Sequence, residues 1–447
     1  MRASAFKETG GPEVLRLVDL PDPEPGPGEI LIRVAYAGVN YGEIQHRLGD
    51  FGQPAGETVP GLEASGRVTA LGEGVTEVSI GDTVTAYLPN GGGYAEYAVA
   101  PAVFAFPPAG DLGRPLPVGL DLPLPATSTL PPTDGLDGRA GDSGGVRGGF
   151  APRVGGPDRL RGGFASRVGG PGRLPDGLDG RVGDSGGVRG GFAPRVGGFD
   201  RLSDGLDGRI GGPDRLPDGP GGRVGDSGGL QGGFVPRGGG LDLRTAGGAA
   251  LVLTTAYGVL VGAARVAPGD TVLVHAAAGG VGGVAAQLAR ALGAGQVYGT
   301  VSTPEKAEYA RRSFGYDEVF VREGFPEAVL AATSGRGVDI VLDPVGGPTR
   351  LASFEILAPF GRLAVYGEAA RHPDLRLPVL PIWKHNRTLT GYNIGDLARR
   401  DPATVRAHAL SALALAASGA VRIDVTEEYG LADAAEAHRV LGEGRNR

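Results

Sequence analysis

Short apolar runs separated by glycine pairs dominate the first 107 residues and predict β-strands. In the run at residues 29–36, Ile30, Ile32 and Val34 alternate with polar positions and so share one face. Further strands are expected at residues 64–71, 83–88 and 94–100. The pattern therefore predicts a barrel-like, mainly β domain.

From about residue 241 onward, apolar strands alternate with helical stretches. Strands are expected at residues 271–275, 296–301, 338–342, 362–366 and 388–392. Helices are expected at residues 243–264, 281–292, 304–313, 325–332, 349–357, 402–418 and 431–441. This alternation predicts an α/β fold, a Rossmann domain with a doubly wound parallel sheet.

Between these regions the apolar pattern is lost and a repeat takes its place. From Asp134 the chain falls into eight units of 14 residues, each with arginine at its sixth position and rich in glycine. Each unit has one or two apolar side chains, too few to offset a backbone entropy cost of roughly 1–2 kcal/mol per ordered residue. We therefore expect this Gly-rich low-complexity insert, residues 108–240, to be disordered. The alternatives are a loose β arrangement and a binding surface.

The charge and composition of the chain argue against some classes of binding partner. The chain of 447 residues has a formal net charge of −7, which argues against nucleic acid or an anionic membrane as a general partner. Aspartates interleaved with the repeat's arginines argue against RNA contact there. No apolar run reaches the roughly 18 residues that a spanning helix needs, and residues 1–19 have no signal-peptide character. A cytoplasmic location is expected.

The strongest chemical signal is the segment T-V-L-V-H-A-A-A-G-G-V-G-G-V-A-A-Q-L-A-R at residues 271–290. Gly280, Gly282 and Ala285 fit the pattern G-x-G-x-x-A between an expected strand and an expected helix. Glycine lets the backbone approach a pyrophosphate, and the N–H groups of the helix start bind the anion. The alternative is a strand-to-helix turn packed tightly without a ligand, but the flanking elements favour a dinucleotide site.

The end of the next strand distinguishes the two nicotinamide cofactors. An NAD enzyme needs a carboxylate there for the ribose 2′-hydroxyl group, but Val301 is followed by Ser302 rather than by an acid. Ser302 and Lys306 would bind a 2′-phosphate, with Arg311 or Arg322 as weaker candidates. A lysine that is merely solvated is the alternative for Lys306. The sequence therefore predicts NADPH.

Together with further motifs, these residues resemble the quinone oxidoreductase, or zeta-crystallin, branch of the medium-chain dehydrogenase/reductase superfamily. The motifs are G-V-N-Y-G-E-I-Q-H-R-L-G at 38–49, P-G-L-E-A-S-G at 60–66, G-D-T-V at 81–84, G-Y-A-E-Y at 93–97, L-T-T-A-Y-G at 253–258, D-P-V-G-G at 343–347 and Y-G at 366–367. The resemblance covers about residues 1–107 and 241–447. It implies a GroES-like catalytic domain at 1–107, an NADPH-binding Rossmann domain at 241–395 and a C-terminal segment at 396–447 that returns to the catalytic domain.

One motif distinguishes this branch from the zinc enzymes of the superfamily. Those enzymes carry Gly-His-Glu where this chain has Gly61-Leu62-Glu63, and a cysteine at or near the position of Asn40. Leucine has no lone pair for a metal, and the chain contains no cysteine. We therefore expect no metal, and a structural role for Glu63.

The resemblance also implies site residues and partners. The implied cofactor-binding residues are Thr254, Tyr257, Gly279, Gly280, Val281, Gly282, Ser302, Lys306, Asp343, Val345, Gly346, Tyr366 and Gly367. Asn40, Tyr41 and Gln45 are the catalytic candidates; Tyr41, Gln45 and a bound water are open alternatives for the proton or hydrogen-bond donor. A homodimer is expected, with a small electrophile as substrate.

The implied reaction is metal-free hydride transfer from NADPH to a quinone or another activated C=C or carbonyl compound. A 2-enoyl-thioester reductase is the alternative among enzymes. An NADPH-binding structural or RNA-binding protein without turnover is the alternative from another class.

Overall fold

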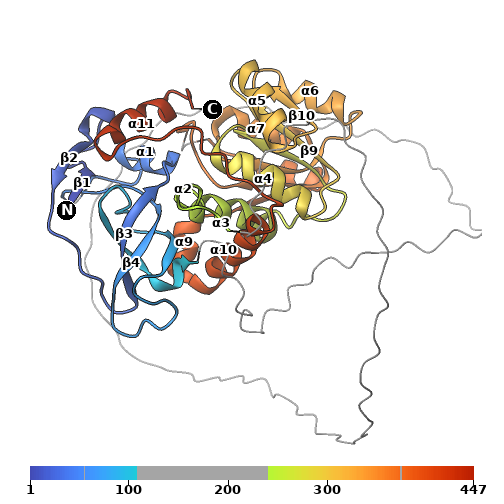
Figure 1. Cartoon of the computed structure of the whole chain (residues 1–447). Helices are drawn as coiled ribbons and strands as arrows, with labels where there is room; N and C mark the ends of the chain where they lie inside the picture. Colours follow the sequence, from blue (N-terminus) through green and yellow to red (C-terminus); the bar gives the residue numbers. More distant parts are fainter. Residues whose placement is uncertain (55, 108–239, 373–374, 447) are drawn as a thin grey trace, which may run out of the picture. The chain divides into compact units, whose positions relative to one another are not determined.

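The computed structural model describes residues 1–54, 56–107, 240–372 and 375–446 (Figure 1). These residues belong to one compact unit, which spans Met1–Leu122 and Gly232–Arg447. All but the last residue of the expected insert lies outside the described residues, and its disorder stays a prediction.

The N-terminal part is antiparallel, as the mainly β pattern predicts. Its main sheet has the order β6-β3-β4-β5-β7, formed by β3 (Glu29–Ala37), β4 (Glu63–Leu71), β5 (Thr83–Tyr87), β6 (Tyr97–Pro101) and β7 (Ala105–Phe106). A separate pair joins β1 (Arg2–Ala5) to β2 (Arg16–Asp19), and the short helix α1 (Tyr41–Arg47) follows β3. The strand expected from residue 94 begins only at Tyr97, because Ala95 makes an isolated bridge to Ala3 instead.

A six-stranded parallel sheet follows in the order β10-β9-β8-β11-β12-β13, which confirms the Rossmann prediction. Its strands are β8 (Thr271–His275), β9 (Gln296–Val301), β10 (Glu318–Val321), β11 (Val338–Asp343), β12 (Leu357–Val365) and β13 (Thr388–Gly391). Chain order reverses between β8 and β11, and doubly wound folds bind their ligands at the carboxyl ends of such neighbouring strands.

The helix expected at residues 243–264 is interrupted. The structure has α2 (Leu243–Ala246), then α3 (Ala250–Gly258), and then a π-helical turn at Val259–Ala263. Gly247 and Gly248 separate the first two segments, and glycine is among the weakest helix formers. The remaining helices are α4 (Gly280–Ala291), α5 (Pro304–Phe314), α6 (Phe325–Ala332), α7 (Gly347–Glu355), α8 (Val379–Lys384), α9 (Ile394–Arg400), α10 (Pro402–Ala417) and α11 (Ala434–Gly442).

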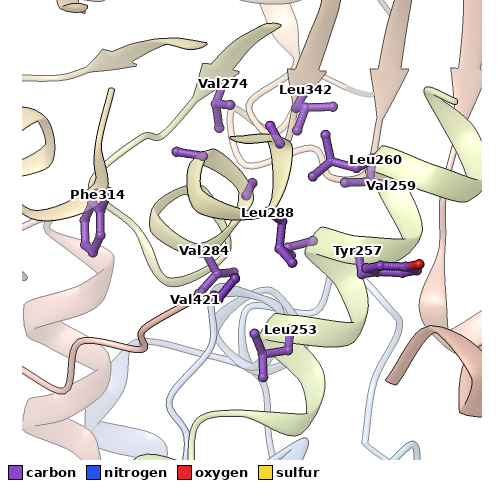
Figure 2. Packing of buried hydrophobic residues seen from close by; sticks show 14 of the residues in the cluster. Leu253, Tyr257, Val259, Leu260, Val274, Val284, Leu288, Phe314, Leu342 and Val421 are labelled. Atoms are coloured by element: carbon purple, nitrogen blue, oxygen red, sulfur yellow. The ribbon is translucent and has the colours of Figure 1, made fainter. Parts of the chain in front are cut away.

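The core of the Rossmann domain holds α4 in place. In Figure 2, Val284 and Leu288 of α4 face Leu253 and Leu260 of the preceding helical segments, beneath the sheet residue Val274. All five side chains are buried, and burying each one contributes roughly 1.5–3 kcal/mol. The loop that precedes α4 is therefore attached to a rigid helix.

Candidate active site

The glycine loop between β8 and α4 has the geometry of an anion cradle. Gly279 caps α4 without a side-chain hydrogen bond, so no side chain occupies the N–H groups of the first turn. A Cβ atom at Gly282 would collide with the carbonyl oxygen of Ala276, so this close approach requires glycine. Gly280 and Val281 begin the helix beside this turn. The loop therefore fits a pyrophosphate group.

Buried polar side chains form hydrogen bonds around the glycine loop and at the end of β8. Tyr316 donates a 2.8 Å hydrogen bond to the carbonyl oxygen of Gly282. His275, at the end of β8, lies 2.6 Å from both Thr300 Oγ1 and Ser353 Oγ through its two ring nitrogens. Burial lowers the pKa of His275 to about 4, so the ring is neutral at pH 7. No local sequence pattern identifies these residues, because their partners lie on other elements.

Two cations lie at the carboxyl ends of β9 and β10. Lys306 occupies the first turn of α5, which Thr303 caps with its side-chain oxygen, and Ser302 is exposed beside it. The backbone N–H of Arg322 donates to the carbonyl oxygen of Val301 at 2.8 Å. Burial and the positive charge of Arg322 both lower the pKa of Lys306, and no described carboxylate opposes them. This pair fits a phosphate group.

The loops after β11 and β12 are joined by Arg350, a residue that the sequence reading missed. Its Nε atom donates to Asp343 Oδ2 at 2.6 Å, and its Nη2 atom donates to the carbonyl oxygen of Gly367 at 2.8 Å. The other oxygen of Asp343 accepts hydrogen bonds from the backbone of Val345 and Gly346 at 2.8 and 2.9 Å. Asp343 is fully buried, and its carboxylate holds the loop in shape through these bonds.

Glu368 extends this arrangement toward α1. Its carboxylate forms an ion pair with Arg350, and its carbonyl oxygen accepts a hydrogen bond from Gln45 Nε2 at 3.3 Å. Tyr41 donates to the neighbouring carbonyl oxygen of Ala369 at 3.3 Å. The structure thus brings two catalytic candidates against the loop that follows Tyr366 and Gly367.

Asn40 lies at the start of α1, beside two buried carboxylates. Its Nδ2 atom donates to Glu63 Oε1 at 2.9 Å and to Glu43 Oε1 at 3.4 Å. Burial raises the pKa of Glu63 to about 7. Within the described part of the chain, no cluster of three or more histidine, aspartate or glutamate residues could hold a metal.

The two cofactor-binding candidates on α3 are buried. The hydroxyl group of Thr254 donates to the carbonyl oxygen of Ala250, and the residue is 1% exposed. Tyr257 is also buried, with its ring 5.8 Å from that of His408 on α10. The α3 side chain that reaches the glycine loop is Val252, which would contact a Cβ atom at Gly280.

Comparisons with known proteins agree with this arrangement. Residues 26–109 match the alcohol dehydrogenase GroES-like domain, and residues 280–414 match the zinc-binding dehydrogenase family. The chain is 34% identical over 200 residues, 44% of its length, to a highly reducing polyketide synthase of Emericella nidulans. It is 37% identical over 181 residues, 40% of its length, to a mycocerosic acid synthase-like polyketide synthase of Mycobacterium tuberculosis. It spans only 8% of the length of each of these curated relatives.

Solved structures resemble nearly the whole chain. A mycobacterial protein solved with NADPH is 26% identical with a TM-score of 0.65, covering 99% of this chain and 97% of its own. A mycobacterial quinone oxidoreductase is 26% identical with a TM-score of 0.62, covering 100% and 97%. The Escherichia coli quinone oxidoreductase, solved with NADPH, shares the fold at 21% identity and a TM-score of 0.63, covering 99% and 97%. The chain belongs to the medium-chain dehydrogenase/reductase superfamily, in its quinone oxidoreductase branch.

Proposed function

We propose that the protein reduces a quinone or another activated C=C or carbonyl compound with NADPH, without a metal. The choice of cofactor rests on the cations Lys306 and Arg322, which follow β9 and β10. An NAD enzyme would have a carboxylate at the end of β9. The mycobacterial relative solved with NADPH supports the same choice.

Each part of the bound cofactor has residues suited to hold it. The backbone of residues 279–282 would bind the pyrophosphate, and Ser302, Lys306 and Arg322 would bind the 2′-phosphate. Val345, Gly346, Tyr366 and Gly367 would border the nicotinamide half, in loops that Arg350 holds together. When bound, NADPH supplies the hydride.

Reduction of a quinone to a hydroquinone also consumes a proton. Asn40, Tyr41 and Gln45 lie at the start of α1, next to the loop after β12. We assign the proton donor to Tyr41, because its 3.3 Å bond to Ala369 is long for an O–H donor and is readily exchanged for a bond to a substrate oxygen. In this assignment Gln45 positions the loop.

An apolar surface at the edge of the Rossmann sheet supports a homodimer. Side chains of β12, α8 and β13 are strongly exposed: Phe360, Val379 and Trp383 at 76% each, Leu380 at 55% and Leu389 at 42%. β13 is an edge strand of the sheet. Edge strands and apolar patches both favour association, and a second copy of the chain offers a matching surface. A Trp383→Glu variant should then elute as a monomer in size-exclusion chromatography with light scattering.

A 2-enoyl-thioester reductase is the second candidate, and one observation favours it. The polyketide synthases match this chain at 34% and 37% identity, above the 26% of the solved quinone oxidoreductase. Those synthases are much longer proteins, so their activities are not carried over as a whole.

Steady-state NADPH oxidation separates these candidates. The full chain is assayed with 9,10-phenanthrenequinone and, separately, with crotonyl-coenzyme A. We expect a higher kcat/KM with the quinone; a higher value with the thioester would establish the second candidate. Exclusive turnover of the thioester would contradict the quinone proposal.

A further inference from the structure

A chain of buried polar side chains runs from the C-terminal helix α11 to Asn40. His438, on α11, is 0% exposed, and its Nε2 atom lies 3.2 Å from the hydroxyl oxygen of Tyr94. Tyr94 donates a 2.6 Å hydrogen bond to Glu43 Oε2. Glu43 also accepts hydrogen bonds from the backbone N–H groups of Asn40 at 2.9 Å and Leu62 at 2.8 Å. The proposed hydride transfer does not use the side chains of His438, Tyr94 and Glu43.

Every link in this chain has a fixed direction. Arg47 Nε lies 3.3 Å from His438 Nδ1, and a guanidinium group can only donate. Burial lowers the pKa of His438 to about 3, so the ring is neutral and its one proton must be on Nε2. That N–H donates to the oxygen of Tyr94, which leaves the hydroxyl hydrogen of Tyr94 for Glu43. Glu43 is therefore held as an acceptor.

The direction of these bonds determines which end of the Asn40 carboxamide faces inward. Asn40 Nδ2 is 2.9 Å from Glu63 Oε1 and 3.4 Å from Glu43 Oε1. An ionised carboxylate only accepts, so above the pKa of Glu63, which burial raises to about 7, both hydrogens of the NH₂ group are directed at carboxylates. The second oxygen of Glu63 is occupied by the backbone N–H of Leu251 at 2.8 Å. The carboxamide oxygen faces the backbone N–H of Glu43 in a capping box, and its second lone pair is what the Asn40 side chain can offer to a ligand.

We propose that Glu43, Tyr94 and His438 are positioning residues that hold the carboxamide of Asn40 in one orientation. The site then presents a hydrogen-bond acceptor at Asn40 and takes a donor group there, such as a ribose hydroxyl or a carboxamide N–H. An enolate oxygen requires a donor, so Asn40 does not stabilise it. This inference rests on the proposed function in one respect, the location of Asn40 in the cofactor and substrate site.

The Tyr94→Phe variant tests the proposal without altering a group that touches the ligand. It removes the hydrogen bond to Glu43 and leaves Asn40 unchanged. Tyr298→Phe is the matched control, because Tyr298 is equally buried and its hydroxyl group is 3.5 Å from the carbonyl oxygen of Ala332, in the nucleotide-binding domain. We expect Tyr94→Phe to lower kcat/KM about tenfold and to weaken NADPH binding, and Tyr298→Phe to change neither by more than about twofold.

A double-mutant cycle separates positioning from a general structural effect. If Tyr94 acts through Asn40, Tyr94→Phe causes no additional loss in an Asn40→Ala background. An equal loss in both backgrounds would overturn the proposal. Glu43→Gln should give a larger loss than Tyr94→Phe, because it places an NH₂ group among donors, and Glu43→Asp should recover part of it.

A second variant and a direct measurement of NADPH binding complete the test. If Tyr94→Phe does not fold, His438→Leu interrupts the same chain one residue further from Asn40 and is taken through the same cycle. NADPH affinity is measured by fluorescence titration as well as by turnover. A wild-type chain that binds NADPH but reduces no substrate would contradict the proposed function, while the binding cycle would still decide the role of Tyr94.

Discussion

The hydroxyl group of Thr85 donates a 2.6 Å hydrogen bond to the carbonyl oxygen of Ala246, 161 residues further along the chain. Thr85 is also paired with Phe106 in the sheet. Phe106 lies just before the repeat-rich segment and Ala246 just after it, so both boundaries of the segment meet at one residue of β5. The chain therefore leaves and re-enters the folded core at neighbouring points.

Deletion of residues 134–236 should therefore leave NADPH affinity and kcat/KM within about twofold of the full chain. Loop-closure entropy changes by only about 0.6 kcal/mol for each doubling of loop length, so the core loses little when the loop is shortened. Affinity is measured by fluorescence titration and folding by circular dichroism. A deletion variant that folds normally yet loses affinity or turnover would show that the repeat contributes to the site.

Arg350→Ala should weaken both folding and cofactor binding. Removing the guanidinium group leaves the carboxylate of Asp343 buried without its partner, a change that costs about 3–5 kcal/mol. The same change disconnects the two loops that border the nicotinamide half. Arg399→Ala is the control, because its ion pair with Asp396 is exposed and contributes little. Chemical unfolding and NADPH titration are the measurements, and equal behaviour of the two variants would contradict the role given to Arg350.

Lys306→Ala should reduce NADPH affinity about tenfold to a hundredfold and leave NADH affinity nearly unchanged. A charge-assisted hydrogen bond contributes about 1.5–3 kcal/mol. NADH has no 2′-phosphate, so it makes no such bond with Lys306 and loses nothing when the lysine is removed. Lys7→Ala, at an exposed lysine of the N-terminal domain, is the control. Equal losses for both cofactors would refute the assignment of Lys306.

The titration of Glu63 should appear in the pH dependence of stability. Burial raises the pKa of Glu63 to about 7, above the value of about 4.3 for an unfolded glutamate. The folded state therefore holds the proton more tightly, and this stabilisation is present below about pH 4 and lost as the pH rises through 7. The stability of the wild type relative to Glu63→Gln should fall by about 3 kcal/mol between pH 4 and pH 8. Urea unfolding measures this difference, with exposed Glu73→Gln as control; a constant difference would contradict the raised pKa.

Most of the fold could be predicted from patterns within short stretches of sequence. The glycine loop could be predicted because its strand, its glycines and its helix are contiguous in sequence. β10 was not predicted, since its four residues, Glu318–Val321, are too short for a clear pattern. The roles of Arg350, Tyr316 and His438 could not be predicted either. Their partners lie on other elements, so nothing in the neighbouring sequence identifies them.

A single-turnover experiment shows whether the protein transfers the hydride of NADPH to a quinone. The purified full chain, in excess over NADPH, is mixed with 9,10-phenanthrenequinone, and the absorbance of NADPH at its nicotinamide band is followed in time. We expect loss of that absorbance only when the quinone is present, with one hydroquinone formed per NADPH consumed. If NADPH binds tightly but is never oxidised, with this quinone or with crotonyl-coenzyme A, the protein binds the cofactor without turnover and is not a reductase of either kind.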